Sequence, residues 1–128
     1  MERSIEMFAG VQFLILGLSH LLQPRAWVDF FVVLRERGLP GVFANAFLSL
    51  VFGSVIVGFH NVWTGLPMVL TLIGWAQILK SFVGFVLPQV SMRGLQRVAP
   101  ERAWEFRVGG VIALALAGLM AHLVARST

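Results

Sequence analysis

Only a few side chains in this 128-residue sequence could do chemistry, and most of them lie within or beside long apolar runs. Glu6 and His20 fall near the two ends of the first run, His60 closes the second, Lys80 lies within the third and His122 lies near the end of the fourth. A carboxylate and an imidazole can pass a proton between them, and an ammonium group can attract an anion. Because an ionisable group at membrane depth is costly, each of these residues is a candidate for function.

Glu6, His60 and His122 are expected near the same membrane surface, and Asn61 follows His60 in the turn "GFHNVWTGLP". Together these four residues form a candidate polar cluster. Two interpretations fit them: a titrating group that passes or senses protons, or ordinary interfacial residues, with Glu6 favoured by the helix dipole. A metal or haem site needs several ligands at one depth, and the chain has no cysteine. No metal and no cofactor are therefore predicted.

A second candidate set lies along the third apolar run and comprises Thr71, Gly74, Trp75, Gln77 and Lys80. Lys80 either carries a charge that serves a pathway or extends its four-carbon side chain to the headgroups. The indole N–H of Trp75 needs a partner in lipid, so Trp75 is expected either to pack over a neighbouring glycine with a polar contact or to line a cavity. The set is thus a candidate for an intramembrane pathway or for helix packing.

The composition indicates that lipid is the solvent for most of the chain. Apolar residues make up 58%, charged residues 12%, and the mean hydropathy is +0.85, whereas a water-soluble domain carries about 25% charged residues. Four runs reach the roughly 20 residues that cross the hydrocarbon layer as a helix, at about 4–22, 42–60, 66–87 and 106–125. Backbone groups in lipid must be paired within the segment, which predicts helices. The expected fold class is all-α, a polytopic membrane protein with a single domain over residues 1–128.

The links between the runs differ in character. Residues 24–38 are too few to span, and their apolar side chains share one side of a helix, which predicts an amphipathic helix in the plane of the interface. Residues 88–105 are polar and basic, and Pro100 is expected to open the fourth helix. The link at 60–65 is short and uncharged, so spans two and three should form a tight antiparallel hairpin. Stripes of small or polar residues on each run favour a compact four-helix bundle.

The basic residues predict the orientation. Seven arginines lie in or directly beside the two long links, at 23–41 and 88–107, and two more, Arg3 and Arg126, lie near the termini. Because cytoplasmic loops carry the excess of Lys and Arg, both long links are expected in the cytoplasm. Both termini would then face the periplasm of a bacterium whose inner membrane holds the protein. Trp27 and Trp104 would anchor the cytoplasmic interface and Trp63 the outer one.

The residues around the hairpin resemble a known pattern. "FHNVW", "TLIGW" and the lysine that follows are similar to the His-Asn-x-Trp turn, the Thr-x-x-Gly-Trp step and the lysine of small bacterial four-span integral membrane proteins usually described as uncharacterised. The resemblance covers mainly spans two and three, and "GLSHLLQP" in span one is a weaker similarity. It implies no activity, but it singles out seven residues: His60, Asn61, Trp63, Thr71, Gly74, Trp75 and Lys80.

Motifs of soluble enzymes, such as a phosphate-binding loop, a nucleophile elbow or HExxH, do not occur in the sequence. A nucleic-acid motif is also absent, although the net charge is +4. The sequence therefore favours a non-enzymatic protein, either a homo-oligomer or an accessory subunit of a larger membrane complex. The alternative is a small transporter or channel for protons or small solutes that uses Lys80 and the polar face of span three. An enzyme acting on lipid or quinone would have to be assembled from Glu6, His60 and His122.

Overall fold

The fold consists of helices. In the computed structural model, which describes residues 2–126, four helices are long and apolar enough to cross a membrane: α1 (Glu2–Leu22), α3 (Leu39–Phe59), α4 (Met68–Val86) and α6 (Ala103–Arg126), the last preceded by the 3₁₀ turn η1 (Pro100–Arg102). The described residues contain no strand. The chain is therefore an all-α, multi-pass membrane protein, as the sequence predicts, and its long helices begin and end within a few residues of the predicted positions.

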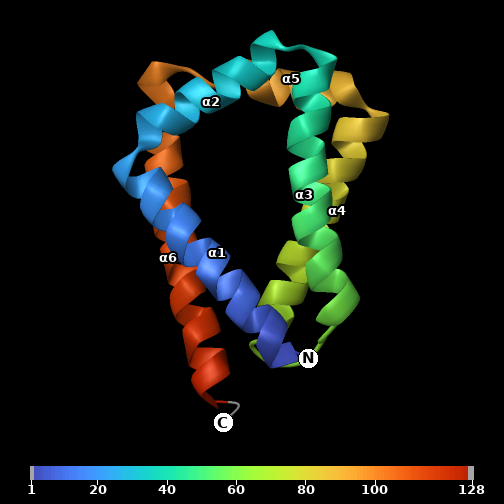
Figure 1. Cartoon of the computed structure of the whole chain (residues 1–128), viewed down its shortest axis with the longest axis vertical. Coiled ribbons are helices and arrows are strands. Elements are labelled where there is room, and N and C mark those ends of the chain that lie inside the picture. Colours follow the sequence, from blue (N-terminus) through green and yellow to red (C-terminus); the bar gives the residue numbers. More distant parts are fainter. Residues whose placement is uncertain (1, 127–128) are drawn as a thin grey trace.

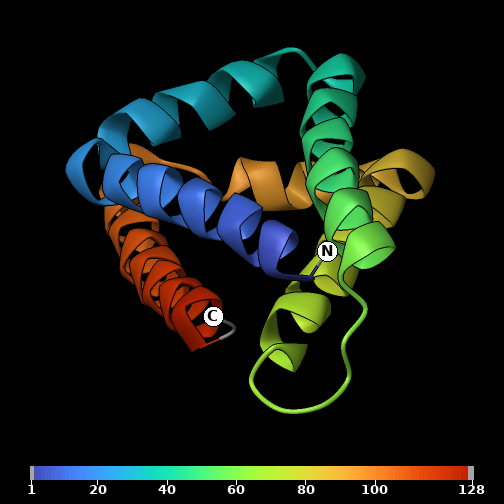
Figure 2. The same cartoon turned by 60° about the horizontal axis from the view of Figure 1, so that its bottom comes forward.

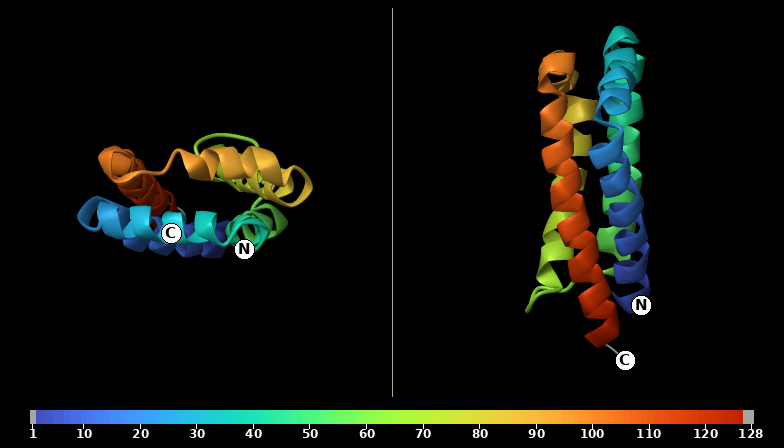
Figure 3. Two further views of the ribbon diagram at one scale, coloured as in Figure 1. Left: turned by 90° about the horizontal axis from the view of Figure 1, so that it is seen from above. Right: turned by 90° about the vertical axis from the view of Figure 1, so that its left-hand side faces the viewer.

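Two short amphipathic helices connect the spans at one end. α2 (Pro24–Glu36) is the predicted interfacial helix, and the chain turns into α3 at Gly38, whose φ of 66° favours glycine. α5 (Pro88–Gln96) lies in the polar and basic link, for which the sequence predicts no helix. Pro88 opens this helix with its fixed φ, and Leu95 is its buried residue. Figures 1 and 3 show α2 and α5 lying across the ends of the spans.

The four spans pack as two antiparallel pairs. α1 pairs with α6 and α3 pairs with α4, whereas α1 and α3 touch less extensively. Figure 1 shows the pairs converging where α1 begins and diverging toward α2 and α5. Seen from the side, α1 and α3 form one layer and α4 and α6 form the other (Figure 3). The bundle is thus joined at one end and bridged by short helices at the other.

The two ends of the bundle differ in what they bury. The terminal end comprises the start of α1, the α3–α4 turn and the end of α6, and Figure 2 brings it forward. The basic end comprises α2, α5, η1 and the adjoining turns of the spans. The main apolar core lies at the terminal end and takes residues from all four long helices: Ile5, Ala9, Ile56, Leu70, Met120 and Leu123. The terminal end is therefore where the two pairs are fastened to each other.

Glycines let the helices within each pair approach closely. A Cβ atom on Gly110 of α6 would lie 2.8 Å from the Gly17 carbonyl oxygen and 2.8 Å from the Leu21 nitrogen of α1. In the other pair, a Cβ atom on Gly53 of α3 would lie 2.8 Å from the Gly74 carbonyl oxygen of α4. Any side chain at these positions would push the backbones apart. The predicted stripes of small residues therefore include the contact points within each pair.

Candidate functional site

One buried polar network joins the two helix pairs at the terminal end. His60 Nε2 lies 3.2 Å from Glu6 Oε1, and His60 Nδ1 lies 3.1 Å from Thr71 Oγ1. His60 and Thr71 are fully buried, and Glu6 is 4% exposed. The network therefore connects α1 of one pair with the end of α3 and the start of α4 in the other pair.

The local structure of the α3–α4 turn places His60 beside Thr71. His60 follows the last residue of α3, and its backbone N–H donates to the Ile56 carbonyl over 2.7 Å. The chain then turns through Gly65, whose φ is 70°, and α4 begins within a few residues, so Thr71 lies in its first turns. The backbone N–H of Val62 donates to Thr71 Oγ1 over 3.0 Å. This bond holds the start of the turn against α4.

The hydrogen-bond donors and acceptors of the network fit one arrangement. The Val62 N–H donates to Thr71 Oγ1, and the Thr71 hydroxyl lies 3.3 Å from the His60 carbonyl oxygen, which can only accept. With the hydroxyl proton given to that carbonyl, His60 Nδ1 must supply the hydrogen of its contact with Thr71. A further proton then lies between His60 Nε2 and Glu6 Oε1, since one of the two atoms must donate. The Glu6 carboxyl group and the His60 imidazole are therefore hydrogen-bonded to each other, which suits a buried position in a membrane protein.

Hydroxyl, imidazole and carboxylate are the groups of a nucleophilic triad, but the hydroxyl of this network is not free to react. Thr71 Oγ1 accepts from Val62 and from His60, and it donates to the His60 carbonyl. Its proton and both lone pairs are thus in use. Because Thr71 is also fully buried, a substrate has no access to it. The arrangement is suited to holding helices together and to retaining a proton, not to attacking a substrate.

The other two members of the predicted polar cluster lie outside this network. Asn61 is exposed, and its Oδ1 accepts a hydrogen bond of 2.9 Å from the indole Nε1–H of Trp63. His122 is exposed on α6, and its side chain makes no hydrogen bond to any residue within 2–126. The structure thus brings Glu6 and His60 together and leaves Asn61 and His122 outside.

Thr71 is the network member that belongs to the second predicted set, the one along α4. The signal that could have found it is the short turn, because a tight hairpin sets the first turns of α4 against the end of α3. A polar residue at the end of one helix and another at the start of the next are then neighbours. His60 and Thr71 are close enough in the sequence for their contact to be predicted in this way. The contact between His60 and Glu6 cannot be predicted in this way, because it depends on how α1 crosses the hairpin.

The residues of the second predicted set divide among different faces of α4. Thr71 and Gly74 are buried, Gln77 is half-buried, and Trp75 and Lys80 are exposed. Trp75 and Lys80 are five positions apart, which separates them by about 140° around a helix. The Trp75 indole N–H makes no hydrogen bond within the described residues, so the expected polar contact is absent there. These five side chains do not line one common path within the chain.

An aromatic cluster at the basic end holds α2 against α1. Trp27 Nε1 donates to Ser19 Oγ over 2.8 Å, and the Trp27 ring stacks on His20 with a centroid separation of 4.1 Å. His20 Nδ1 donates to the Leu16 carbonyl over 2.7 Å, and Phe106 of α6 lies on the cluster with a ring centroid 5.9 Å from that of His20. Trp27 is therefore docked on α1, whereas the other two predicted anchors, Trp63 and Trp104, are exposed.

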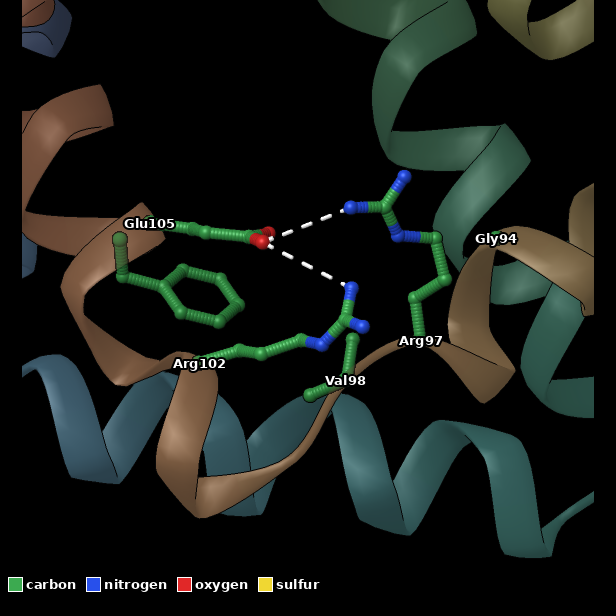
Figure 4. A pocket seen from close by; sticks show the side chains of 6 residues that line it. Gly94, Arg97, Val98, Arg102 and Glu105 are labelled. Carbon is green, nitrogen blue, oxygen red and sulfur yellow. Dashed lines mark hydrogen bonds and ion pairs between the residues drawn. The ribbon is translucent and has the colours of Figure 1, made fainter.

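A small pocket of about 260 Å³ lies at the basic end, between α5 and the start of α6 (Figure 4). On its wall, Glu105 Oε1 lies 3.5 Å from Arg97 Nη2 and 3.9 Å from Arg102 Nη1. The Arg97 side chain is 66% exposed and that of Glu105 is 39% exposed. Arg35 of α2 donates from Nη1 to the Val98 carbonyl over 2.9 Å. That bond ties α2 to the chain that follows α5.

Comparisons with known proteins identify no family for this chain. The chain matches no protein-family model, no curated protein and no solved structure. Within residues 2–126, no three histidine, aspartate or glutamate side chains come close enough together to hold a metal ion. The candidate site is therefore defined by its own geometry, a buried and hydrogen-bonded network that crosses between two helix pairs.

Proposed function

We propose that the chain is a non-enzymatic component of a membrane assembly, either a homo-oligomer or an accessory subunit of a larger complex. The observation that carries the proposal is the low burial of the spans. Only 22–28% of the residues in the apolar window of each long helix are buried within the chain. The rest is surface that lipid or the helices of another chain must cover. Large exposed apolar residues occur on all four spans and include Ile15, Leu48, Leu79 and Val111.

The polar network supports a structural role over a catalytic one. Its hydroxyl, imidazole and one carboxylate oxygen are engaged with one another, and they join two helix pairs that share their main core only at the terminal end. A network of this kind fixes the relative position of the pairs. A subunit that presents a defined surface to a partner needs such a fixed connection between its two helix pairs.

The proposed location is a bacterial inner membrane, with the basic end in the cytoplasm and the terminal end in the periplasm. Support comes from the arginines of the two long links, which belong to the basic end. The positive-inside rule assigns that end to the cytoplasm. A cysteine-accessibility assay on intact cells, with a single cysteine placed at exposed Thr64 or at exposed Arg93, tests this orientation. Labelling at position 93 and protection at position 64 would contradict it.

The first test of the assembly is the native mass after extraction in a mild detergent. A single chain has a mass of 14.1 kDa. We expect a protein mass of at least two chains, or one chain together with a co-purifying partner. A lone chain with no partner would contradict the proposal.

Cysteine crosslinking locates the interface, because the natural chain has no cysteine and each introduced one is unique. Leu79 and Ile15 are 64% and 60% exposed, whereas Ile56 is fully buried and serves as the control position. For a homo-oligomer, we expect crosslinks between copies at one of the two exposed positions and none at position 56. For an accessory subunit, the crosslinked product has the mass of a different partner.

A small transporter or channel for protons or small solutes is the second candidate, and the 3.2 Å contact between Glu6 Oε1 and His60 Nε2 is the observation that favours it. Lys80 would then supply a charge along α4. The test is flux into liposomes that contain the purified protein, with Lys80→Ala and His60→Ala as variants. Flux that both variants lower would favour this function. Flux no higher than in empty liposomes would contradict it.

A further inference from the structure

A groove between α1 and α6 opens on the outside of the helix pair at the terminal end. Its volume is about 600 Å³, within the range of about 300–1,000 Å³ that small-molecule sites occupy. Apolar and small residues of both helices form its walls, among them Gly10, Leu14, Gly118 and Ala121. A Cβ atom on Gly118 would meet no atom within 4 Å. The groove is therefore open space and not part of the contact between the two helices.

Glu6 is the one ionisable side chain on the wall of this groove. Its side chain is 6% exposed, and its Oε1 is engaged with His60. Its other oxygen, Oε2, makes no hydrogen bond to any residue that the structure describes. No buried side-chain oxygen of the described residues lacks a hydrogen-bond partner, so Oε2 is accessible and not sealed inside the protein, and Glu6 lines the groove. Glu6 is thus the single polar side chain on the wall of the groove, and its Oε2 can accept a hydrogen bond.

We propose that this groove binds an elongated apolar molecule with one hydrogen-bond-donating head group, an alcohol or an amine, that donates to Glu6 Oε2. The apolar chain of the ligand fills the space along Leu14 and Gly118. An anionic head group is disfavoured because no cationic side chain lines the groove to offset the carboxylate. The occupant is a small ligand and not another subunit, so the proposal goes beyond the assembly role.

The dimensions favour a lipid-like molecule over a helix of another chain. A helix of ten residues is about 10 Å across and 15 Å long, which is roughly twice the volume of the groove. A partner helix would also place apolar side chains against the Glu6 carboxylate and leave Oε2 unpaired. A ligand with a donor head group satisfies that oxygen and fills the apolar remainder.

Photoactivatable probes test the proposal on the full chain in nanodiscs. Three sixteen-carbon probes carry the same diazirine in mid-chain and differ only in ending as an alcohol, an amine or a methyl group. Mass spectrometry maps and counts the labelled sites on α1 and α6. We expect the alcohol or the amine to label the groove about tenfold more than the alkane, as one net hydrogen bond to Glu6 implies.

Two glycines of α6 provide a matched pair of variants for this experiment. Gly118→Phe fills the groove, whereas Gly109→Phe adds the same side chain at a position that is also open but does not line the groove. Labelling of the groove should fall at least tenfold in the first variant and stay unchanged in the second. Glu6→Gln, which weakens the acceptor, should reduce the advantage of the alcohol over the alkane.

Three outcomes would overturn the proposal. Equal labelling by the alkane would show a lipid-exposed surface without head-group recognition. Unchanged labelling in Gly118→Phe would place the probe elsewhere. Probe-independent crosslinks between two chains through single cysteines in the groove would assign it to a protein contact. The native mass measured for the assembly does not depend on any of these results, so the two proposals fail separately.

Discussion

Each end of the bundle contains a carboxylate beside a basic group, but the surroundings of the two pairs differ. At the terminal end, Glu6 and His60 approach to 3.2 Å, and their side chains are 6% and 0% exposed. At the basic end, Glu105 and Arg97 approach to 3.5 Å, and their side chains are 39% and 66% exposed. The two distances are similar, so burial is the main difference between the pairs.

Burial changes what a pair does for the fold. In water, two charges 4 Å apart attract by only about 1 kcal/mol, and side-chain entropy opposes even that gain. In an apolar interior, the loss of one partner leaves the other group without a hydrogen bond and without solvent. The terminal pair therefore connects the two helix pairs, and each of its two residues needs the other as its hydrogen-bond partner. The basic pair is an adjustable surface contact, and packing together with the Arg35–Val98 bond holds that end.

The largest expected effect comes from removing the central member of the buried network. His60→Ala should lower the free energy of unfolding in mixed micelles by about 3–5 kcal/mol, because Glu6 and Thr71 are left without their shared partner. His122→Ala is the control, since it deletes an exposed histidine of the same end. We expect a change of less than about 0.5 kcal/mol in the control. Equal effects of the two variants would contradict the claim that burial within the network makes His60 important for stability.

Loss of the Thr71 hydroxyl should have the next largest effect. Thr71→Val keeps the shape of the side chain but leaves the Val62 N–H and His60 Nδ1 without their acceptor. We expect a loss of about 2–3 kcal/mol, since each unpaired buried group costs about 1–3 kcal/mol. Thr64→Val changes an exposed threonine of the same turn and should have little effect. Unfolding curves of both variants under the same conditions make the comparison.

We predict that close packing, and not charge, holds α1 against α6. Gly110→Ala would set a Cβ atom 2.8 Å from backbone atoms of α1, and we expect it to cost on the order of 1–2 kcal/mol. The adjacent Gly109→Ala meets no atom within 4 Å and serves as the control. Thermal unfolding of the two variants decides the question. An equal response would mean that the two helices are not held by this close approach.

The smallest expected effect comes from the exposed ion pair. Arg97→Gln should change stability by less than about 1 kcal/mol, and the change should shrink further at high salt. Arg35→Gln, which removes the donor to the Val98 carbonyl, should cost more than Arg97→Gln. Unfolding at low and at high salt measures both. A larger loss from Arg97→Gln than from Arg35→Gln would contradict the view that the basic ion pair is an adjustable contact.

Much of the fold could be predicted from the sequence, because hydropathy and segment length decide how a chain crosses a membrane. The four spans and the interfacial helix at 24–36 follow from these quantities. α5 could not be found in the same way, since its nine residues are too few to span a membrane and give only a short amphipathic pattern. Its start at Pro88 and its buried Leu95 are visible only once the helix is known to lie across the basic end.

The candidate site was predictable only in part. The position of Glu6 and His60 near one membrane surface follows from the order of the spans, and their chemistry follows from their residue types. Their contact does not, because the two residues are 54 positions apart and depend on how α1 crosses the α3–α4 hairpin. His122 belongs to the same end but lies on an exposed part of α6. Helix rotation therefore decided which histidine joins the network, and one sequence does not determine it.

The most direct test of this connection between the helix pairs is a pair of double-mutant cycles that treat both ends alike. One cycle combines Glu6→Ala with His60→Ala, and the other combines Arg97→Ala with Glu105→Ala, with unfolding free energies measured in the same micelles. We predict a coupling energy of about 2 kcal/mol or more at the terminal end and less than about 1 kcal/mol at the basic end. Coupling near zero between Glu6 and His60 would contradict the claim that their buried pair fastens the two halves of the bundle.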